Sequence, residues 1–302
     1  MNNESKYLPC SCCNINIDSY SEDMPLILVI AKLWNKYANR GKGFVPRFFG
    51  NLFRETLNKI IIRTKHGARL AIEPSSLEVY THMLNHGNTW NEHVFDACKT
   101  SLGNEGVFYD IGANVGYMSI EMAKIFGEKV SVIAFEPQPL LAHAIALSSK
   151  LNKFENVKVF DLMLGETIGE ANLYVGSHSI HASGVAREKN STCIKRSVTT
   201  IDYMIEASLI PPPNVIKLDI EGGELAALSG ARKTIISYRP HIIFESDENM
   251  ERFGYTRNDV INLIKTMGIY DFFFISGTNC ELIECANDNS SFAYSDILAK
   301  PI

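Results

Sequence analysis

The sequence predicts an α/β protein with a doubly wound, mostly parallel sheet, and three observations support this fold class. Short apolar segments typical of buried strands alternate with longer segments of helical periodicity. A glycine-rich turn joins the first core strand to the following helix. Acids follow five expected strands, namely Asp110, Glu136, Asp161, Asp219 and Glu245. Because the carboxyl ends of parallel strands bind ligands, we expect these acids to share one ligand-binding rim.

Composition and length fit a globular chain with one large domain and an N-terminal addition. The 302 residues are 46% hydrophobic and 21% charged, with a formal net charge of −5. The polar, aperiodic segment 1–23 predicts a disordered leader. We expect a basic helical and β-hairpin extension at 24–103 and the ligand-binding core domain at 104–302.

The seven cysteines predict neither a disulfide framework nor a zinc site. Cys10, Cys12 and Cys13 cluster near the N-terminus, but no paired Cys or His spacing supplies a fourth zinc ligand. The other cysteines show no pairing pattern, and no signal-peptide pattern precedes them. These features favour a reducing compartment, and we expect a cytoplasmic protein.

The N-terminal extension is rich in basic and aromatic residues. Segments 25–38 and 46–57 predict two helices, and the first is too short for the ~20 residues that span a bilayer. Segment 32–69 contains ten basic residues against one acid, Glu55. Either this charge is solvated on a helical cap, or it contacts the anionic headgroups of a membrane surface, or it contacts a phosphate-bearing acceptor. No nucleic-acid-binding motif accompanies it, so nucleic acid is not an expected partner.

The remaining elements follow from periodicity and turn residues. A β-hairpin is expected around His66–Gly67, followed by helices at 76–84 and 90–102. The expected core strands are 106–110, 130–135, 157–161, 215–218, 241–244 and 272–275, and the expected helices are 116–126, 139–151, 201–206, 224–236 and 257–267. We further expect 171–175 to form the second arm of a hairpin from Leu164, 176–197 to be a polar loop, and 292–298 to be an edge strand.

The turn after the first core strand indicates which ligand the domain binds. Asp110 precedes Gly112 and Gly116, and a carboxylate there repels a pyrophosphate but attracts a cation. S-adenosylmethionine carries an ammonium and a sulfonium group and no phosphate. Glu136 ends the next strand, where a carboxylate binds ribose hydroxyls. Asn114 replaces the second glycine of a dinucleotide fingerprint, which disfavours a nicotinamide cofactor; an ordinary βαβ turn without a ligand is the alternative.

Two further stretches carry candidate chemistry. Segment 217–224 brings Asp219, Glu221 and Glu224 together around two glycines. These acids either orient an acceptor or hold a divalent cation, or they cap the following helix, and we assign no metal ligands. The loop 176–184 contains His178 and His181, which are candidates for a general base, and Ser183.

These motifs resemble the FkbM-type S-adenosylmethionine-dependent methyltransferases. The matching segments are FYDIGANVGYMSI (108–120), AFEPQP (134–139), NKFENVKVFDLMLGETIGEANLYV (152–175), SVTTIDYMI (197–205) and VIKLDIEGGELAALSGARKTI (215–235). The resemblance covers most of 105–246 and implies a Rossmann-like class I fold with a seven-stranded sheet. It implies methyl transfer, usually to a hydroxyl of a sugar or secondary metabolite. Gly223 departs from the family pattern, where alanine is commoner, and residues 1–58 lie outside the resemblance.

The resemblance also assigns expected roles. It implies that Asp110, Gly112, Asn114 and Gly116 contact the methionine end of the cofactor and that Glu136 binds its ribose. We add Asp161 to the cofactor site, and we expect Glu221 and Ser183 to contact a small-molecule or glycan acceptor. The candidate catalytic residues are His178, His181, Asp219 and Glu224. The competing interpretations are a nucleoside-binding protein without catalytic activity and, less favoured, a nicotinamide-dependent oxidoreductase.

Overall fold

The computed structural model describes the core of the chain and parts of the extension. The described residues are 60–72, 83, 88–175, 182–184, 191–247, 249–276, 279–282 and 295–302. The predicted leader, both N-terminal helices, the Cys10, Cys12 and Cys13 cluster, and His178 and His181 lie outside these ranges. Within the described ranges, none of the helices has both the length and the apolar composition that a membrane span requires.

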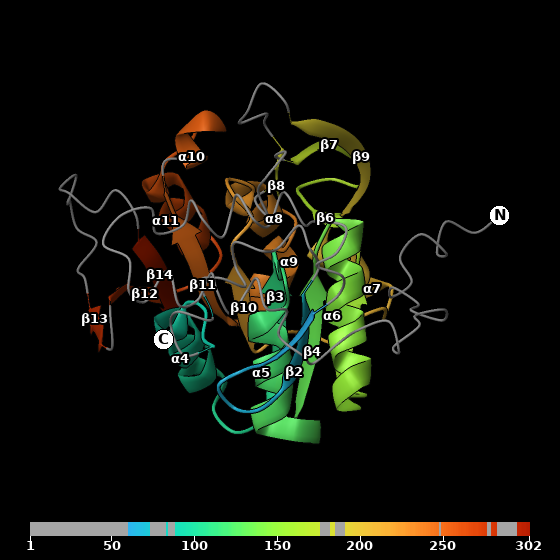
Figure 1. The fold of residues 1–302 in the computed structure, drawn as a ribbon. Coiled ribbons are helices and arrows are strands. Elements are labelled where there is room, and N and C mark those ends of the chain that lie inside the picture. Colours follow the sequence, from blue (N-terminus) through green and yellow to red (C-terminus); the bar gives the residue numbers. More distant parts are fainter. Residues whose placement is uncertain are drawn as a thin grey trace, which may run out of the picture.

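A mostly parallel sheet with helices on both faces forms the centre of the molecule (Figure 1). Its strand order is β13-β12-β14-β11-β10-β3-β4-β5. The bounds are β3 Gly106–Ile111, β4 Val130–Phe135, β5 Val157–Phe160, β10 Val215–Leu218, β11 His241–Ser246, β12 Tyr270–Ser276, β13 Asn279–Leu282 and β14 Ser295–Pro301. Apart from β13, which pairs with β12 at the edge, these strands form the predicted seven-stranded class I sheet. The prediction of a doubly wound α/β fold is therefore confirmed.

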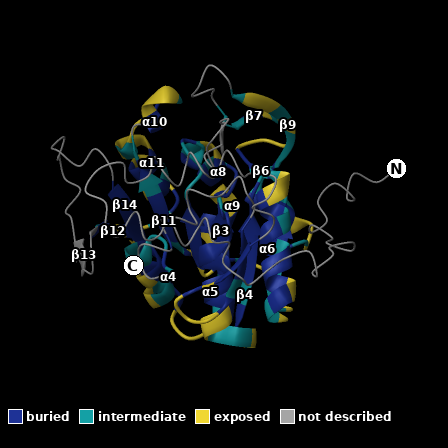
Figure 2. Cartoon of the chain, viewed as in Figure 1, coloured by how far each residue is buried: buried dark blue, intermediate teal, exposed yellow. Residues whose placement is uncertain are grey.

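The inner strand β3 is buried on both sides, because its alternate side chains enter different apolar clusters. Tyr109 and Ile111 of β3 pack in one cluster, whereas Phe108 packs in the other. The second cluster also contains residues of helices α4 (Glu92–Leu102) and α5 (Tyr117–Phe126). Figure 2 shows the resulting buried centre, with exposed residues mainly in loops, at helix ends and in α10. This two-sided burial explains why the strands are continuous apolar segments.

The remaining helices complete the two layers. Helix α6 (Pro139–Asn152) begins with a proline, whose fixed backbone angle suits the first helical position. The first apolar cluster gathers residues from the helices α7 (Ile201–Glu206), α8 (Glu224–Ser229), α9 (Arg232–Tyr238), α10 (Asn249–Arg252) and α11 (Arg257–Lys265). A short 3-10 helix, η4 (Gly127–Lys129), precedes β4 at the opposite end of the sheet from the acidic rim.

The prediction of one helix over 224–236 is wrong, because α8 and α9 are separate. Gly230 lies at the break, and a Cβ atom there would come within 2.0 Å of the backbone oxygen of Gly165. The two backbones therefore approach so closely that a side chain does not fit between them. The helical periodicity of the segment carried no signal of this contact.

The expected edge strand at 292–298 is also corrected by the structure. Strand β14 begins at Ser295 and lies between β11 and β12, antiparallel to both. Its consecutive buried residues Ile297, Leu298 and Ala299 fit an inner position rather than an edge. Sequence order placed the strand last in the chain but did not indicate its place in the sheet.

A small second sheet extends beyond the carboxyl end of the central one, at the upper right of Figure 1. It contains β6 (Met163–Leu164), β7 (Gly169–Val175), β8 (Ala182–Ser183) and β9 (Thr192–Thr199). The expected hairpin between Leu164 and 171–175 is wrong, since β7 pairs with β8 and β9. The C-terminal part of the expected polar loop is strand β9. Its largely polar side chains form no continuous apolar segment that would have predicted a strand.

The predicted β-hairpin is confirmed and joins the core through two helices. Strands β1 (Ile60–Arg63) and β2 (Arg69–Ile72) pair antiparallel. Ser148 of α6 accepts a hydrogen bond from the Ala71 amide at 2.9 Å. Glu121 of α5 is fully buried and accepts the Thr64 hydroxyl, while His66 Nδ1 contacts its other carboxylate oxygen. A buried carboxylate is stable only with such partners, so the turn of the hairpin supplies the hydrogen bonds that Glu121 of α5 requires.

The turn between β3 and α5 contacts the end of β10 without room for a side chain. Gly112 has a φ of +77°, and a Cβ atom there would lie 1.9 Å from the backbone oxygen of Asp219. We expect Gly112→Ala to lower the free energy of unfolding by about 3 kcal/mol or more, because backbone strain adds to the clash. Urea unfolding followed by circular dichroism measures this loss.

The matched control is Gly67→Ala, where φ is +81° but nothing lies within 4 Å of the added Cβ. This variant should lose roughly 1 to 2 kcal/mol from backbone strain alone. Equal losses in the two variants would contradict the close approach at Gly112.

Candidate functional site

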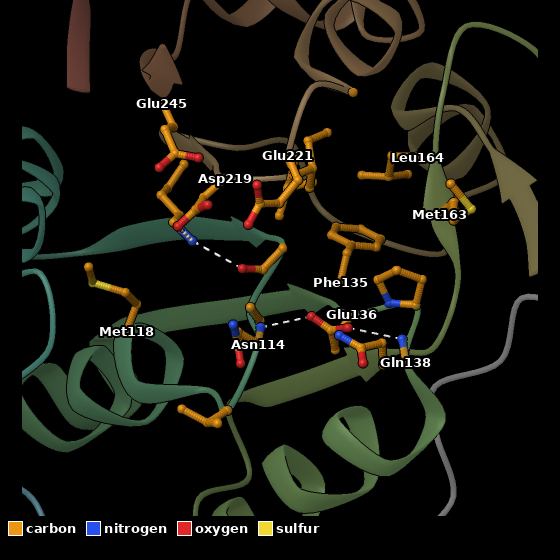
Figure 3. Close-up of a pocket in the computed structure, with 18 of the residues that line it drawn as sticks. Asn114, Met118, Phe135, Glu136, Gln138, Met163, Leu164, Asp219, Glu221 and Glu245 are labelled. Atoms are coloured by element: carbon orange, nitrogen blue, oxygen red, sulfur yellow. Dashed lines mark hydrogen bonds and ion pairs between the residues drawn. The ribbon is translucent and has the colours of Figure 1, made fainter. Parts of the chain in front are cut away.

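A cavity of about 340 Å³ opens at the carboxyl edge of the central sheet. Such a volume suits a small-molecule ligand. Figure 3 shows the acidic side chains Asp219, Glu221 and Glu245 near one side of the cavity and the apolar Met163 and Leu164 near the other. Glu136 and Gln138 come from the segment after β4 and lie opposite the acids. The cavity therefore combines an apolar wall with a small number of placed polar groups.

The glycine-rich turn forms the floor of the cavity. The backbone amides of Gly112 and Ala113 both donate to the oxygen of Phe135, at 2.9 and 3.1 Å, which fixes the turn against β4. Asn114 has a φ of +54°, a conformation that asparagine tolerates better than most residues. Its side-chain Oδ1 is buried and has no hydrogen-bond partner among the described residues. A buried acceptor of this kind on a cavity wall is suited to a donor from a ligand.

Glu136 is the buried carboxylate of the cavity. The Asn114 amide donates to its Oε2 at 2.8 Å, and the Gln138 amide donates to its Oε1 at 2.9 Å. Burial raises the pKa of Glu136 to about 7, although both amides and the nearby Lys217 oppose this shift. Each oxygen keeps acceptor capacity beyond one amide, so the ionised group can accept ligand hydroxyls.

Lys217 links the two main motifs beneath the cavity. Its ammonium lies 3.2 Å from Asp110 Oδ1 and 3.4 Å from Asp219 Oδ2, and it donates to the Gly112 oxygen at 3.1 Å. Asp110 also accepts the Ser119 hydroxyl at 2.6 Å. Burial favours a lower pKa for Lys217, but Asp110 and Asp219 outweigh it and raise the pKa above its usual value. Lys217 is therefore a stable cation and no candidate base.

The acidic loop after β10 is held in a conformation unusual for its residues. Glu221 has a φ of +58°, and such positive values at residues other than glycine tend to occur at functional sites. Asn249 Nδ2 donates to Glu221 Oε2 at 2.8 Å. Glu224 is fully buried, accepts the Ile220 amide at 3.0 Å and lies 2.9 Å from the Tyr255 hydroxyl. Burial raises the pKa of Glu224 to about 7, and its contacts stabilise the loop.

Three carboxylates could offer ligands to a metal ion. Oxygen atoms of Glu221, Glu245 and Asp247 lie within 4.8 Å of one another. The Asn249 side-chain amide donates to both Glu221 and Asp247. An N–H donor directed at these oxygens already supplies part of the positive charge that a cation would bring. The two hydrogen bonds from Asn249 account for the approach of Glu221 to Asp247 without a metal.

With this geometry established, comparison with known proteins assigns the family. The sequence matches the methyltransferase FkbM domain over residues 110–272, more than half of the chain. The chain belongs to the FkbM methyltransferase family. This confirms the resemblance on which the sequence-based prediction rested.

Individual relatives of this FkbM-family chain share limited sequence identity with it. Hexuronic acid methyltransferase AglP of Haloferax volcanii is 30% identical over 135 residues, which cover 44% of this chain and 53% of AglP. The chain thus spans about half the length of this curated relative.

Solved structures share lower similarity. The methyltransferase FkbM of Methylobacillus flagellatus is 16% identical and covers 86% of this chain and 60% of its own, with a TM-score of 0.43. An S-adenosylmethionine-dependent O-methyltransferase of Thermotoga maritima is 12% identical and covers 80% of this chain and 77% of its own, with a TM-score of 0.40.

The structure brings some of the predicted site residues together and places others elsewhere. Gly112, Asn114, Glu136, Asp219 and Glu221 line the cavity. Asp110, Gly116 and Glu224 lie behind its wall, where Asp110 and Glu224 are buried against protein partners and Gly116 packs against Ile145. None of the three is among the residues that line the cavity, and their expected roles toward ligand or substrate stay predictions.

Asp161 and Ser183 stand apart from this group. Asp161 precedes the small sheet, where it pairs with Arg196 of β9 at 2.9 Å, and it is not among the cavity residues. Ser183 belongs to β8, and its neighbour Gly184 lines the cavity, but its side chain lies outside the described set.

Sequence reasoning missed several lining residues. Lys217 carried a detectable signal, since a lysine inside the apolar strand Val215–Leu218 requires a buried counter-charge. Trp90, Gln138 and Phe253 also line the cavity, but no sequence motif marks them. Their place depends on how the loops fold together, which the sequence alone does not show.

The raised pKa of Glu136 predicts a pH dependence of stability. Between its ordinary pKa of 4.5 and about 7, the folded protein binds more protons than the unfolded chain. The free energy of unfolding should therefore fall as pH rises through this window. We expect Glu136→Gln to remove about 1 to 3 kcal/mol of this fall. Urea unfolding between pH 4.5 and 7.5 measures it.

Glu224 contributes a fall of the same sign, so Glu136→Gln should flatten the profile without abolishing it. Wild-type and Glu136→Gln profiles that run parallel across this window would contradict the assignment to Glu136.

Proposed function

We propose that the protein is an S-adenosylmethionine-dependent methyltransferase. The observation that carries this proposal is Glu136, a buried carboxylate on the cavity wall that two backbone amides hold in place. In an α/β sheet of this order, the acid after the second core strand binds the ribose hydroxyls of a nucleoside. Membership of the FkbM family supports the same cofactor.

The residues present fit this cofactor. The buried Asn114 Oδ1 offers an acceptor for the ammonium group, and Glu136 offers acceptors for the ribose. The apolar side chains of Phe135, Met163 and Leu164 line the same cavity as Glu136 and suit a flat aromatic ring (Figure 3). Ion-paired Lys217 adds little positive charge to the floor, which favours a cationic sulfonium over a pyrophosphate.

The proposed reaction is methylation of an acceptor hydroxyl. When bound, S-adenosylmethionine supplies an electrophilic methyl group. The chain must align the hydroxyl oxygen with that methyl carbon and remove the hydroxyl proton. Asp219 lines the cavity and is partly exposed, so its carboxylate is the proposed base. Glu224 faces its own protein partners, and His178 and His181 remain candidates outside the described residues.

We propose a sugar or glycan as the acceptor. The relative AglP is named as a hexuronic acid methyltransferase, which supports a carbohydrate acceptor here. The acidic residues Asp219, Glu221 and Glu245 provide acceptors for several neighbouring hydroxyl groups. We place this activity in the domain 104–302 and in the cytoplasm, with the basic extension as a contact for an anionic acceptor or membrane surface.

Calorimetric titration distinguishes this proposal from its rivals. We expect S-adenosylhomocysteine to bind and NAD not to bind. Glu136→Gln should weaken S-adenosylhomocysteine binding roughly 10- to 100-fold, because a charge-assisted hydrogen bond is lost. The control is Glu128→Gln, an exposed acid in η4 at the far end of β4. Binding of NAD instead would favour an oxidoreductase, and unchanged affinity in Glu136→Gln would place the ribose elsewhere.

Turnover separates an enzyme from a nucleoside-binding protein. With labelled S-adenosylmethionine and a panel of hexoses, N-acetylhexosamines and hexuronic acids, we expect methyl transfer to a hydroxyl. Asp219→Asn should lower kcat roughly 10²- to 10⁴-fold, since loss of a general base has this effect. S-adenosylhomocysteine affinity measures the integrity of the cofactor site in the same variant.

His178→Ala and His181→Ala provide the comparison for Asp219. If Asp219→Asn turns over at the wild-type rate while one histidine variant loses activity, that histidine is the base. Binding of S-adenosylhomocysteine without transfer to any acceptor of the panel would support the binding protein.

A further inference from the structure

Lys217 occupies a buried position inside a strand, where a charged side chain is unfavourable unless it is paired. It lies in β10, whose four residues are all buried, and its side chain is 6% exposed. Its strand neighbours Ile216 and Leu218 enter the first apolar cluster, so Lys217 points to the opposite face, toward Asp110 and the turn below the cavity. A buried ammonium is retained in a fold when its partners compensate for lost hydration.

The Lys217 ammonium lies close to three oxygens on three segments. These are Asp110 Oδ1 on β3 at 3.2 Å, the Gly112 oxygen in the turn at 3.1 Å, and Asp219 Oδ2 after β10 at 3.4 Å. Asp110 Oδ1 is buried and has no conventional hydrogen-bond partner among the described residues, so this ion pair is its compensation. The lysine therefore joins the floor of the cavity to its acidic wall.

We propose that Lys217 is a positioning residue that fixes the cofactor-side turn and the Asp219 carboxylate at one spacing. This inference rests on the proposed function, because it assigns the turn to the cofactor and Asp219 to the acceptor. Lys217 lines the cavity from below but acts through the groups that it holds. Loss of its contacts removes the ionic link between the Gly112 carbonyl and the Asp219 carboxylate, which leaves only the backbone contacts between the two loops.

The test must avoid an unpaired buried charge, which would unfold the protein for an unrelated reason. Lys217→Met alone leaves Asp110 without its counter-charge. The pair Asp110→Asn with Lys217→Met is neutral at both sites, and the amide oxygen introduced by Asp110→Asn can still accept the Ser119 hydroxyl. Its reference is Asp110→Asn alone, in which Lys217 keeps its contacts with Gly112 and Asp219. The control is Lys233→Met, an exposed lysine of α9 paired with Glu206 at 2.6 Å.

The first measurement is hydrogen–deuterium exchange of the full chain without ligand. We expect the amides of Gly112, Ala113 and Asp219, which bond to Phe135 and Ile111, to exchange at least ~10-fold faster in the double variant than in Asp110→Asn. Amides in the hairpin β1–β2 should exchange at equal rates in all variants, as should every amide in Lys233→Met relative to wild type. Equal exchange of the turn amides in the double variant and in Asp110→Asn would overturn the proposal.

The second measurement is titration with S-adenosylhomocysteine, with acceptor turnover where binding is found. The double variant should bind at least ~10-fold more weakly than Asp110→Asn and lose kcat further, as both sides of the cavity move. If wild type does not bind S-adenosylhomocysteine, the proposed function fails, and exchange alone decides whether Lys217 holds the turn. If wild type binds and the double variant binds as tightly as Asp110→Asn, the positioning role fails while the proposed function stands.

Discussion

The close approach of the β3–α5 turn to the end of β10 is the constraint on which the cavity depends. Gly112 lies against the backbone oxygen of Asp219, so the floor and the acidic wall contact each other directly, without an intervening side chain. The Asp219 amide in turn donates to the oxygen of Ile111 at 3.0 Å. Two loops far apart in sequence thereby form one surface. Beneath it, the Lys217 ammonium forms ion pairs with Asp110 and Asp219.

The strands and helices of the core could be predicted because buried elements have apolar side chains in a recognisable pattern, namely continuous segments in strands and helical spacing in helices. Strands β4 and β10 and helix α7 have their predicted bounds. The errors arose where structure depends on spatial neighbours. Strand β9 is stabilised by pairing with β7 while its side chains stay polar, and β14 enters the sheet between strands that precede it in the chain. Neither fact appears as a local apolar pattern.

The site was predictable to the level of the loops that form it. The loop residues Gly112, Asn114, Glu136, Asp219 and Glu221 line the cavity as the motifs indicated. Sequence could not show that Asp110 and Glu224 point into the protein, because the direction of a carboxylate depends on partners such as Lys217 and Tyr255. Motif spacing therefore identified the loops, and burial separated the cavity residues from those that support them.

The small sheet contributes to one wall of the cavity from outside the central sheet. It hydrogen-bonds within itself rather than to the central sheet, and β7 and β9 are largely exposed or half-buried. Leu164, Leu173 and Gly184 nevertheless reach the cavity from this segment. The exposed side chains of β7 and β9 can consequently change with little cost to the central sheet, whereas Leu164 packs in the first apolar cluster. Sequence change in these two strands can then alter one wall of the cavity while the glycine-rich turn and Glu136 stay unchanged.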